Sequence, residues 1–272
     1  MITDWTDAYT NGAYIPGAEA FPAAWAEAAR LFREKLEAEG RAKLDISYGE
    51  GRRNRLDLFL PEGAPKGLVV FIHGGYWLNF DKSYWSHLAG GAVARGLAVA
   101  LPSYTLCPEI RIAGISTEVG QAIATAAGMI EGPIHLTGHS AGGHLATRMI
   151  TTTSPLPDTV RARVVNVVSI SGLHDLRPLM RAEMNARLKL DTAEAFTESP
   201  ALLEPWPGAR VTAWVGADER PEFLRQSALL ANIWTGLGAE TASVEEPDKH
   251  HFSIVDGLTE PDHPLVEGLL TA

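Results

Sequence analysis

Short apolar runs rich in β-branched residues alternate along the chain with longer stretches rich in alanine and leucine. The run Leu-Val-Val-Phe-Ile at residues 68–72 is apolar throughout, which is typical of a strand buried on both faces of a parallel sheet. Residues 22–39 instead repeat apolar side chains at helical spacing and stop before Gly40. The same criteria predict further strands at residues 98–101, 134–137, 164–170, 210–215 and 242–245, and further helices at 82–95, 114–130, 141–152, 222–237 and 264–271.

This alternation of strands and helices predicts an α/β fold, with a mostly parallel central sheet and helices on both faces. Residues 44–48 and 55–60 are predicted as an antiparallel pair of strands at one edge. No repeat or long linker divides the chain, so we expect a single domain over residues 1–272, with an N-terminal segment at 1–40. The proline-rich section 174–206 breaks the alternation and is typical of a cap-like insertion; two packing helices with no functional part are the alternative.

Ser140 stands in the pattern Gly138-x-Ser-x-Gly142, between a predicted strand and an alanine-rich predicted helix. A strand-to-helix turn of this sharpness needs small neighbours and holds the serine Oγ clear of the backbone. We therefore predict that Ser140 is a nucleophile, in preference to a helix N-cap. A dinucleotide-binding loop does not fit, because position 140 is serine where the G-x-G-x-x-G pattern needs glycine.

The turn after the strand at 68–72 reads His73-Gly-Gly-Tyr-Trp77. Its two glycines allow backbone N–H groups to face a pocket, where they would stabilise negative charge on a carbonyl oxygen. We assign the oxyanion donors to the N–H groups of Gly75, Tyr76 and Ala141.

A serine nucleophile needs a histidine base and an acid that orients it, and in this topology both follow late strands. His250 and His251 are adjacent candidates for the base, and we prefer His251 because the apolar residues after it would anchor its loop in the core. Asp218 and Glu219 follow the strand at 210–215, and we prefer Glu219 as the acid, with Asp218 as the alternative.

The composition narrows the class of partner. The chain carries 23 Lys and Arg against 33 Asp and Glu, a formal net charge of −10, which disfavours nucleic acid and anionic membrane surfaces. Its single cysteine, Cys107, allows no intrachain disulfide, and we read it as buried packing. The N-terminus shows no secretory signal, so we expect a cytoplasmic protein. No metal or organic cofactor is expected, and a homodimer is compatible with the sequence.

Together, the Gly138–Gly142 motif, the His73–Trp77 turn and the His251-Phe252 pair resemble the α/β-hydrolase superfamily. Further segments, Tyr104–Glu109, Ser171–Leu176 and Pro221–Ser227, are similar to its kynurenine formamidase (arylformamidase) branch and related bacterial esterases. The resemblance implies an α/β-hydrolase fold with Ser140 as nucleophile, His251 as base and Glu219 as acid. The glutamate is a departure, since the animal formamidases have aspartate there. The opening Asp4–Asn11 also resembles that group's N-terminal segment, which implies Tyr9 and Asn11 as substrate contacts; a surface tether is the alternative.

The expected activity is therefore hydrolysis of a small acyl amide or ester through an acyl-enzyme, with arylformamidase activity on N-formyl-kynurenine as the leading hypothesis. A broad carboxylesterase is the alternative within enzymes, and a non-catalytic ligand-binding protein is the alternative from another class. We expect a small, aromatic substrate, with Tyr76, Trp77 and Trp206 as walls of its pocket.

Overall fold

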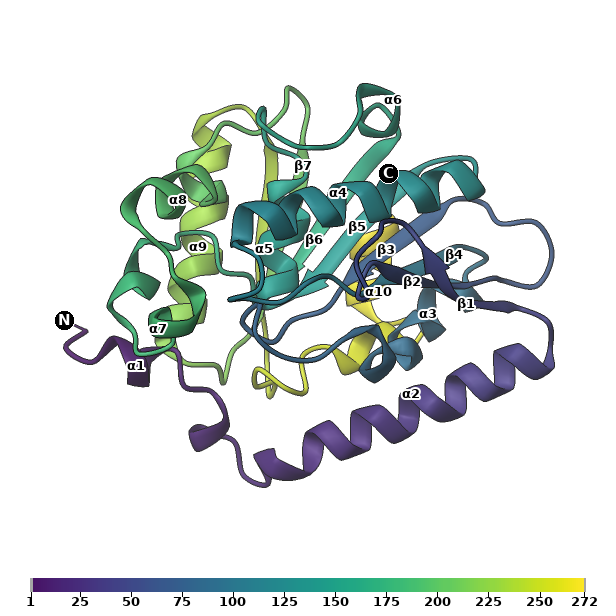
Figure 1. Cartoon of the computed structure of the whole chain (residues 1–272), viewed down its shortest axis with the longest axis horizontal. Helices are drawn as coiled ribbons and strands as arrows, with labels where there is room; N and C mark the ends of the chain where they lie inside the picture. Colours follow the sequence, from purple (N-terminus) through teal and green to yellow (C-terminus); the bar gives the residue numbers. More distant parts are fainter. Residues whose placement is uncertain (1, 272) are drawn as a thin grey trace.

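A single sheet organises the chain. The computed structural model describes residues 2–271 and orders eight strands as β1-β2-β4-β3-β5-β6-β7-β8 (Figure 1). The pairs β1–β2 and β2–β4 are antiparallel, and all other neighbours are parallel. The predicted α/β architecture, with its antiparallel pair at one edge, is confirmed. The strands are β1 Ala42–Ser47, β2 Arg55–Phe59, β3 Leu68–Ile72, β4 Ala98–Pro102, β5 Ile134–His139, β6 Val164–Ile170, β7 Arg210–Gly216 and β8 Glu240–Glu246.

Each face of the sheet has its own core, because successive strand residues point to opposite faces. Leu68, Val70 and Ile72 pack with helices α4, α5 and α9, whereas Val69 and Phe71 pack with α2, α3 and α10. Helices on both faces explain why β3 is apolar at every position. These helices are α2 Phe21–Ala38, α3 Gly90–Ala94, α4 Ile112–Met129, α5 Ala141–Arg148, α9 Pro221–Gly236 and α10 Pro264–Leu270. Within residues 2–271, no helix has the length and apolar character to cross a membrane.

Two predicted helices are shorter than expected. The region 82–95 divides into the 3₁₀ turns η3 Lys82–Tyr84 and η4 Ser86–Ala89, followed by α3. A Cβ at Gly91 would lie 2.6 Å from the carbonyl oxygen of Leu258, so α3 packs closely on the C-terminal region at a glycine, a poor helix former. Helix α5 ends at Arg148, whose buried guanidinium bonds to Glu198.

The section between β6 and β7 folds as four short pieces: η5 Arg177–Arg181, α7 Asn185–Leu188, α8 Thr192–Thr197 and η6 Pro200–Leu202. The guanidinium of Arg111, before α4, joins Glu194 of α8 at 2.6 Å. From this insertion, Met184 reaches the cavity described below. Two further helical pieces are α6 Asp158–Arg161 and η7 Asp256–Thr259.

The N-terminal segment crosses the molecule in an extended path before α2. It contains α1 Trp5–Ala8, η1 Gly12–Tyr14 and η2 Ala18–Ala20, and Figure 1 shows it passing from beside α7 to the start of α2. Tyr9 is fully buried despite lying near the chain end.

Candidate active site

Ser140 occupies a strained turn between β5 and α5. Its backbone has φ +57° and ψ −117°, a conformation that costs a non-glycine residue about 1–3 kcal/mol. A Cβ at Gly138 would lie 2.3 Å from the carbonyl oxygen of Gly142, and one at Gly142 would lie 1.9 Å from that of Ile72. The flanking glycines are therefore required by the close packing of the turn on β3, as the sequence pattern predicted.

We expect Gly142→Ala to destabilise the fold by about 2–4 kcal/mol, because its methyl group would overlap the backbone of β3. Urea unfolding would measure the loss. Gly128→Ala is the matched control: it lies in helix α4 with nothing within 4 Å of its added Cβ, and should be neutral or stabilising. Equal unfolding midpoints for both variants would contradict this packing argument.

His251 is held by a buried carboxylate. Its Nδ1 lies 2.6 Å from Glu219 Oε2, and the Glu219 side chain exposes none of its surface. The other carboxylate oxygen accepts hydrogen bonds from Ser171 Oγ at 2.5 Å and from the Gly216 N–H at 3.0 Å. With Nδ1 fixed, Nε2 is the nitrogen left to serve Ser140, and both residues line one cavity. The sequence analysis did not identify Ser171 as the support of this acid.

The structure places the two pairs of neighbouring candidates, Asp218 with Glu219 and His250 with His251, in different surroundings. Asp218 is exposed, and its backbone N–H donates to the carbonyl of Lys249, whereas Glu219 points inward to His251. His250 accepts backbone hydrogen bonds on its own Nδ1 and packs edge-on against Phe21. The structure therefore brings together the preferred pair, Glu219 and His251.

His139, the residue before Ser140, supports the same imidazole. Its Nε2 lies 2.9 Å from the backbone carbonyl of His251, and the two rings are 4.5 Å apart. Burial, together with the charge that His251 can carry, lowers the pKa of His139 well below its usual value. His139 is therefore neutral at pH 7, and its Nε2 carries the proton because a carbonyl can only accept.

His139→Ala should lower kcat/KM by about 10-fold to 100-fold, because the loop that carries His251 loses its anchor beside Ser140. Steady-state hydrolysis of an activated ester checks this. His139→Gln, which keeps a side-chain N–H donor, should recover part of the loss. Unchanged kinetics in His139→Ala would show that the contact is dispensable.

The turn after β3 lies against the serine. Gly75, Tyr76 and Trp77 all have positive φ, at +107°, +54° and +57°. The N–H groups of Gly75 and Tyr76 donate to no acceptor within residues 2–271. The N–H of Ala141, the first residue of α5, has no acceptor within its helix. These are the three donors expected from the sequence, and Gly75 and Tyr76 line the cavity with Ser140.

The cavity that contains Ser140 has a volume of about 500 Å³ and largely aromatic walls. Trp25 and Trp85 pack with ring centroids 4.7 Å apart and ring planes inclined by 37°, and Phe80 packs edge-on against both. Tyr9 and Asn11 of the N-terminal segment also line it, as the resemblance implied. A cavity with such walls suits a flat, apolar group.

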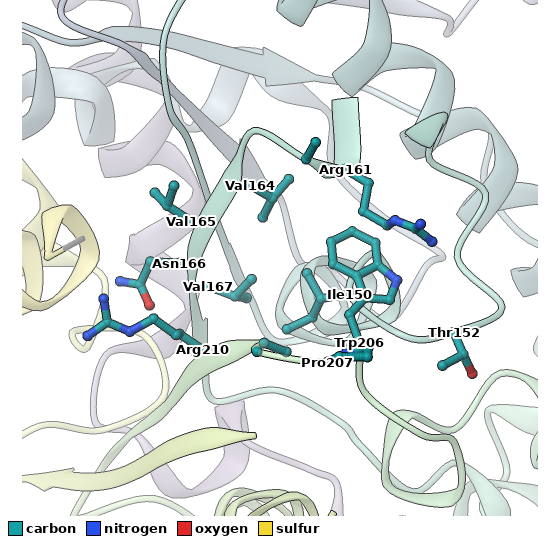
Figure 2. Close-up of a pocket in the computed structure, with 13 residues that line it drawn as sticks. Ile150, Thr152, Arg161, Val164, Val165, Asn166, Val167, Trp206, Pro207 and Arg210 are labelled. Carbon is teal, nitrogen blue, oxygen red and sulfur yellow. The ribbon is translucent and has the colours of Figure 1, made fainter. Parts of the chain in front are cut away.

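Two expected wall residues are elsewhere, and the sequence analysis was wrong about them. Trp77 is fully buried beneath its turn, edge-on to His144. Trp206 lines a second cavity of about 390 Å³ with Arg161 and Arg210, which Figure 2 shows. Trp206 precedes β7 by only a few residues, so it lies at the amino edge of the parallel sheet. Ser140 follows the carboxyl end of β5, at the opposite edge.

No group of three or more His, Cys, Asp or Glu side chains in residues 2–271 is arranged to hold a metal ion. The residues described above bring a hydroxyl, an imidazole paired to a carboxylate, and backbone N–H donors to one cavity.

The sequence and the structure of this chain are similar to those of known proteins. The sequence model of the alpha/beta hydrolase family matches residues 69–266, so the chain belongs to the α/β-hydrolase family and is a hydrolase. It is similar to kynurenine formamidase of Danio rerio, with 27% identity over 247 residues, 87% of this chain and 84% of the relative. A crystal structure from Silicibacter sp. TM1040, described as a candidate thioesterase, is 50% identical, with a TM-score of 0.93 and full coverage of both chains. Esterase B from Lactobacillus rhamnosis, at 18% identity and TM-score 0.66 over 92% of this chain and 91% of that one, shares the fold.

Proposed function

We propose that this protein is a serine hydrolase that removes a small acyl group from an aromatic amide or ester, with arylformamidase activity on N-formyl-kynurenine. One observation carries the proposal: Ser140, on its strained turn, and His251, oriented by buried Glu219, open into the same aromatic cavity. The similarity to kynurenine formamidases over most of both chains supports the choice of acyl group.

In this mechanism Ser140 Oγ gives its proton to His251 Nε2 and attacks the carbonyl carbon. Negative charge then develops on the carbonyl oxygen and is stabilised by the N–H groups of Gly75, Tyr76 and Ala141. His251 passes the proton to the leaving amine or alcohol as its bond to the acyl carbon breaks. Water, deprotonated by His251, then attacks the acyl carbon; the bond to Ser140 Oγ breaks, His251 returns the proton to Oγ, and the acid leaves. Glu219 holds Nδ1–H throughout and stabilises the imidazolium.

The walls of the cavity favour an aromatic leaving group over a long acyl chain. Trp25, Trp85 and Phe80 offer ring faces and edges to an aryl amine, while formyl, the smallest acyl group, needs little space beside Ser140. A carboxylesterase is the second candidate, because the same apolar walls would accept an ester of similar size.

A comparison of substrates on the wild-type chain tests the proposal. Formate release from N-formyl-kynurenine is measured beside hydrolysis of p-nitrophenyl acetate and of an acetyl thioester. We expect kcat/KM on the formamide to be the highest of the three. Turnover of the acetyl esters alone would reject formamidase activity in favour of an esterase or thioesterase, and turnover of none would reject the serine hydrolase itself.

A further inference from the structure

The hydroxyl of Tyr76 is fully occupied by the N-terminal segment. It donates a hydrogen bond to the backbone carbonyl of Tyr9, so its oxygen can only accept from the side-chain amide of Asn11, at 3.1 Å. This assignment leaves no hydrogen on the Tyr76 oxygen for a substrate. The hydroxyl is thus a structural link between the segment before α2 and the turn after β3.

Tyr9 is fixed at its other end as well. Its own hydroxyl donates to Glu222 Oε1 of α9 at 2.8 Å, and Glu222 is almost completely buried. Arg225 and Gln226 of the same helix hold that carboxylate at 2.6 and 2.9 Å. Burial raises the pKa of both tyrosines, and therefore both phenols keep the protons that these bonds require. Tyr9 thus bridges α9, which begins just after Glu219, and the turn that carries Tyr76.

The turn itself needs external support. Gly75, Tyr76 and Trp77 lie consecutively in the left-handed region, where non-glycine residues are rarely stable alone. Trp77 is held by the core, and its carbonyl accepts from the Cys107 N–H at 2.8 Å. Tyr76 faces the cavity, so its link to Tyr9 supplies the support on that side.

We propose that Tyr9 is a positioning residue for catalysis: through the Tyr76 hydroxyl, the N-terminal segment holds the Gly75–Tyr76 turn in the geometry that binds the oxyanion. This inference rests on the proposed serine hydrolase function and extends it, because it gives a segment far from Ser140 in the sequence a part in transition-state stabilisation. The segment acts through the backbone of Tyr76, without touching the reacting atoms itself.

Tyr76→Phe and Tyr9→Phe test the proposal, with Tyr14→Phe as the matched control. Tyr14 lies in the same segment, and its hydroxyl donates to Asp7 of that segment, away from the link between Tyr9 and Tyr76. Two readouts are used: steady-state kinetics on an activated ester, and the rate at which a fluorophosphonate modifies Ser140. In that second reaction Ser140 Oγ bonds to phosphorus, the P–F bond breaks, and the hydroxyl proton passes to His251. It needs the oxyanion donors but no acyl substrate.

For Tyr76→Phe we expect kcat and the phosphonylation rate to fall together by about 10-fold to 100-fold, with KM within about threefold of wild type. Tyr9→Phe should show a smaller fall in the same two quantities, and the double variant should lose less than the product of the single effects, because both act through one link. Tyr14→Phe should match wild type.

The inference is overturned if both Tyr76→Phe and Tyr9→Phe keep the wild-type kcat and phosphonylation rate. If their unfolding midpoints are lowered at the same time, the link serves stability alone. If Tyr76→Phe fails to fold, Tyr9→Phe decides by the same readouts. A wild-type chain that reacts with the fluorophosphonate at Ser140 but does not hydrolyse N-formyl-kynurenine refutes the substrate proposal and leaves this inference standing.

Discussion

Ser140→Ala is expected to lower kcat/KM by roughly 10⁴-fold or more on every substrate that the wild-type chain hydrolyses. The methyl group has no proton to give His251 and forms no acyl-enzyme, so only background catalysis by the N–H donors and binding would remain. The fold should persist, because the β5–α5 turn is held by the packing of Gly138 and Gly142 and by the bond from the Ser140 N–H to the carbonyl of Ile170. Formate release and p-nitrophenol release measure the loss.

The control for this prediction is Ser243→Ala, an exposed serine on edge strand β8 that should leave the kinetics unchanged. Thermal unfolding of both variants separates lost chemistry from lost structure. Full activity of Ser140→Ala on both an amide and an ester would refute the mechanism, whatever its effect on KM.

Much of this fold could be predicted because its signals are local. Five consecutive apolar residues indicate strand β3. The turn at Ser140 is indicated by the glycines on either side of it, where any side chain would overlap the neighbouring backbone. The region 82–95 shows the limit of such local signals. Its composition is compatible with one helix, yet it divides into two 3₁₀ turns and the short helix α3. In α3, Gly91 packs against the carbonyl of Leu258, a contact between residues far apart in the sequence.

The walls and supports of the site were predictable only in part, because they depend on contacts between distant segments. The helical spacing of residues 22–39 includes Trp25 among its apolar positions, but it does not indicate that the Trp25 ring lines the cavity of Ser140. The bond from Tyr9 to Glu222 joins residues 213 positions apart, and no pattern in either segment indicates it. The wrong prediction for Trp206 has a different cause. Trp206 comes just before a parallel strand, and this position alone assigns it to the edge of the sheet opposite Ser140.

The Glu219 side chain is the acid that orients His251 in the proposed mechanism, and Glu219→Gln is the decisive variant. Its carboxylate accepts from Ser171, from the Gly216 N–H and from His251 Nδ1. In glutamine the amide oxygen can keep the first two partners only if the NH₂ group faces Nδ1. That arrangement makes His251 Nδ1 an acceptor and moves the imidazole proton to Nε2. Because Nε2 then carries a proton already, it can no longer accept the proton of Ser140.

We therefore expect Glu219→Gln to lower kcat/KM by about 10⁴-fold with little change in substrate binding, as loss of the correct tautomer does in other triads. Asp218→Asn is the matched control, since it alters the neighbouring carboxylate, which is exposed, and should stay within about twofold of wild type. The fluorophosphonate rate at Ser140 should fall with kcat in Glu219→Gln alone. The reverse result, a large loss in Asp218→Asn and little in Glu219→Gln, would mean that the loop after β7 rearranges when substrate binds and that Asp218 orients the base.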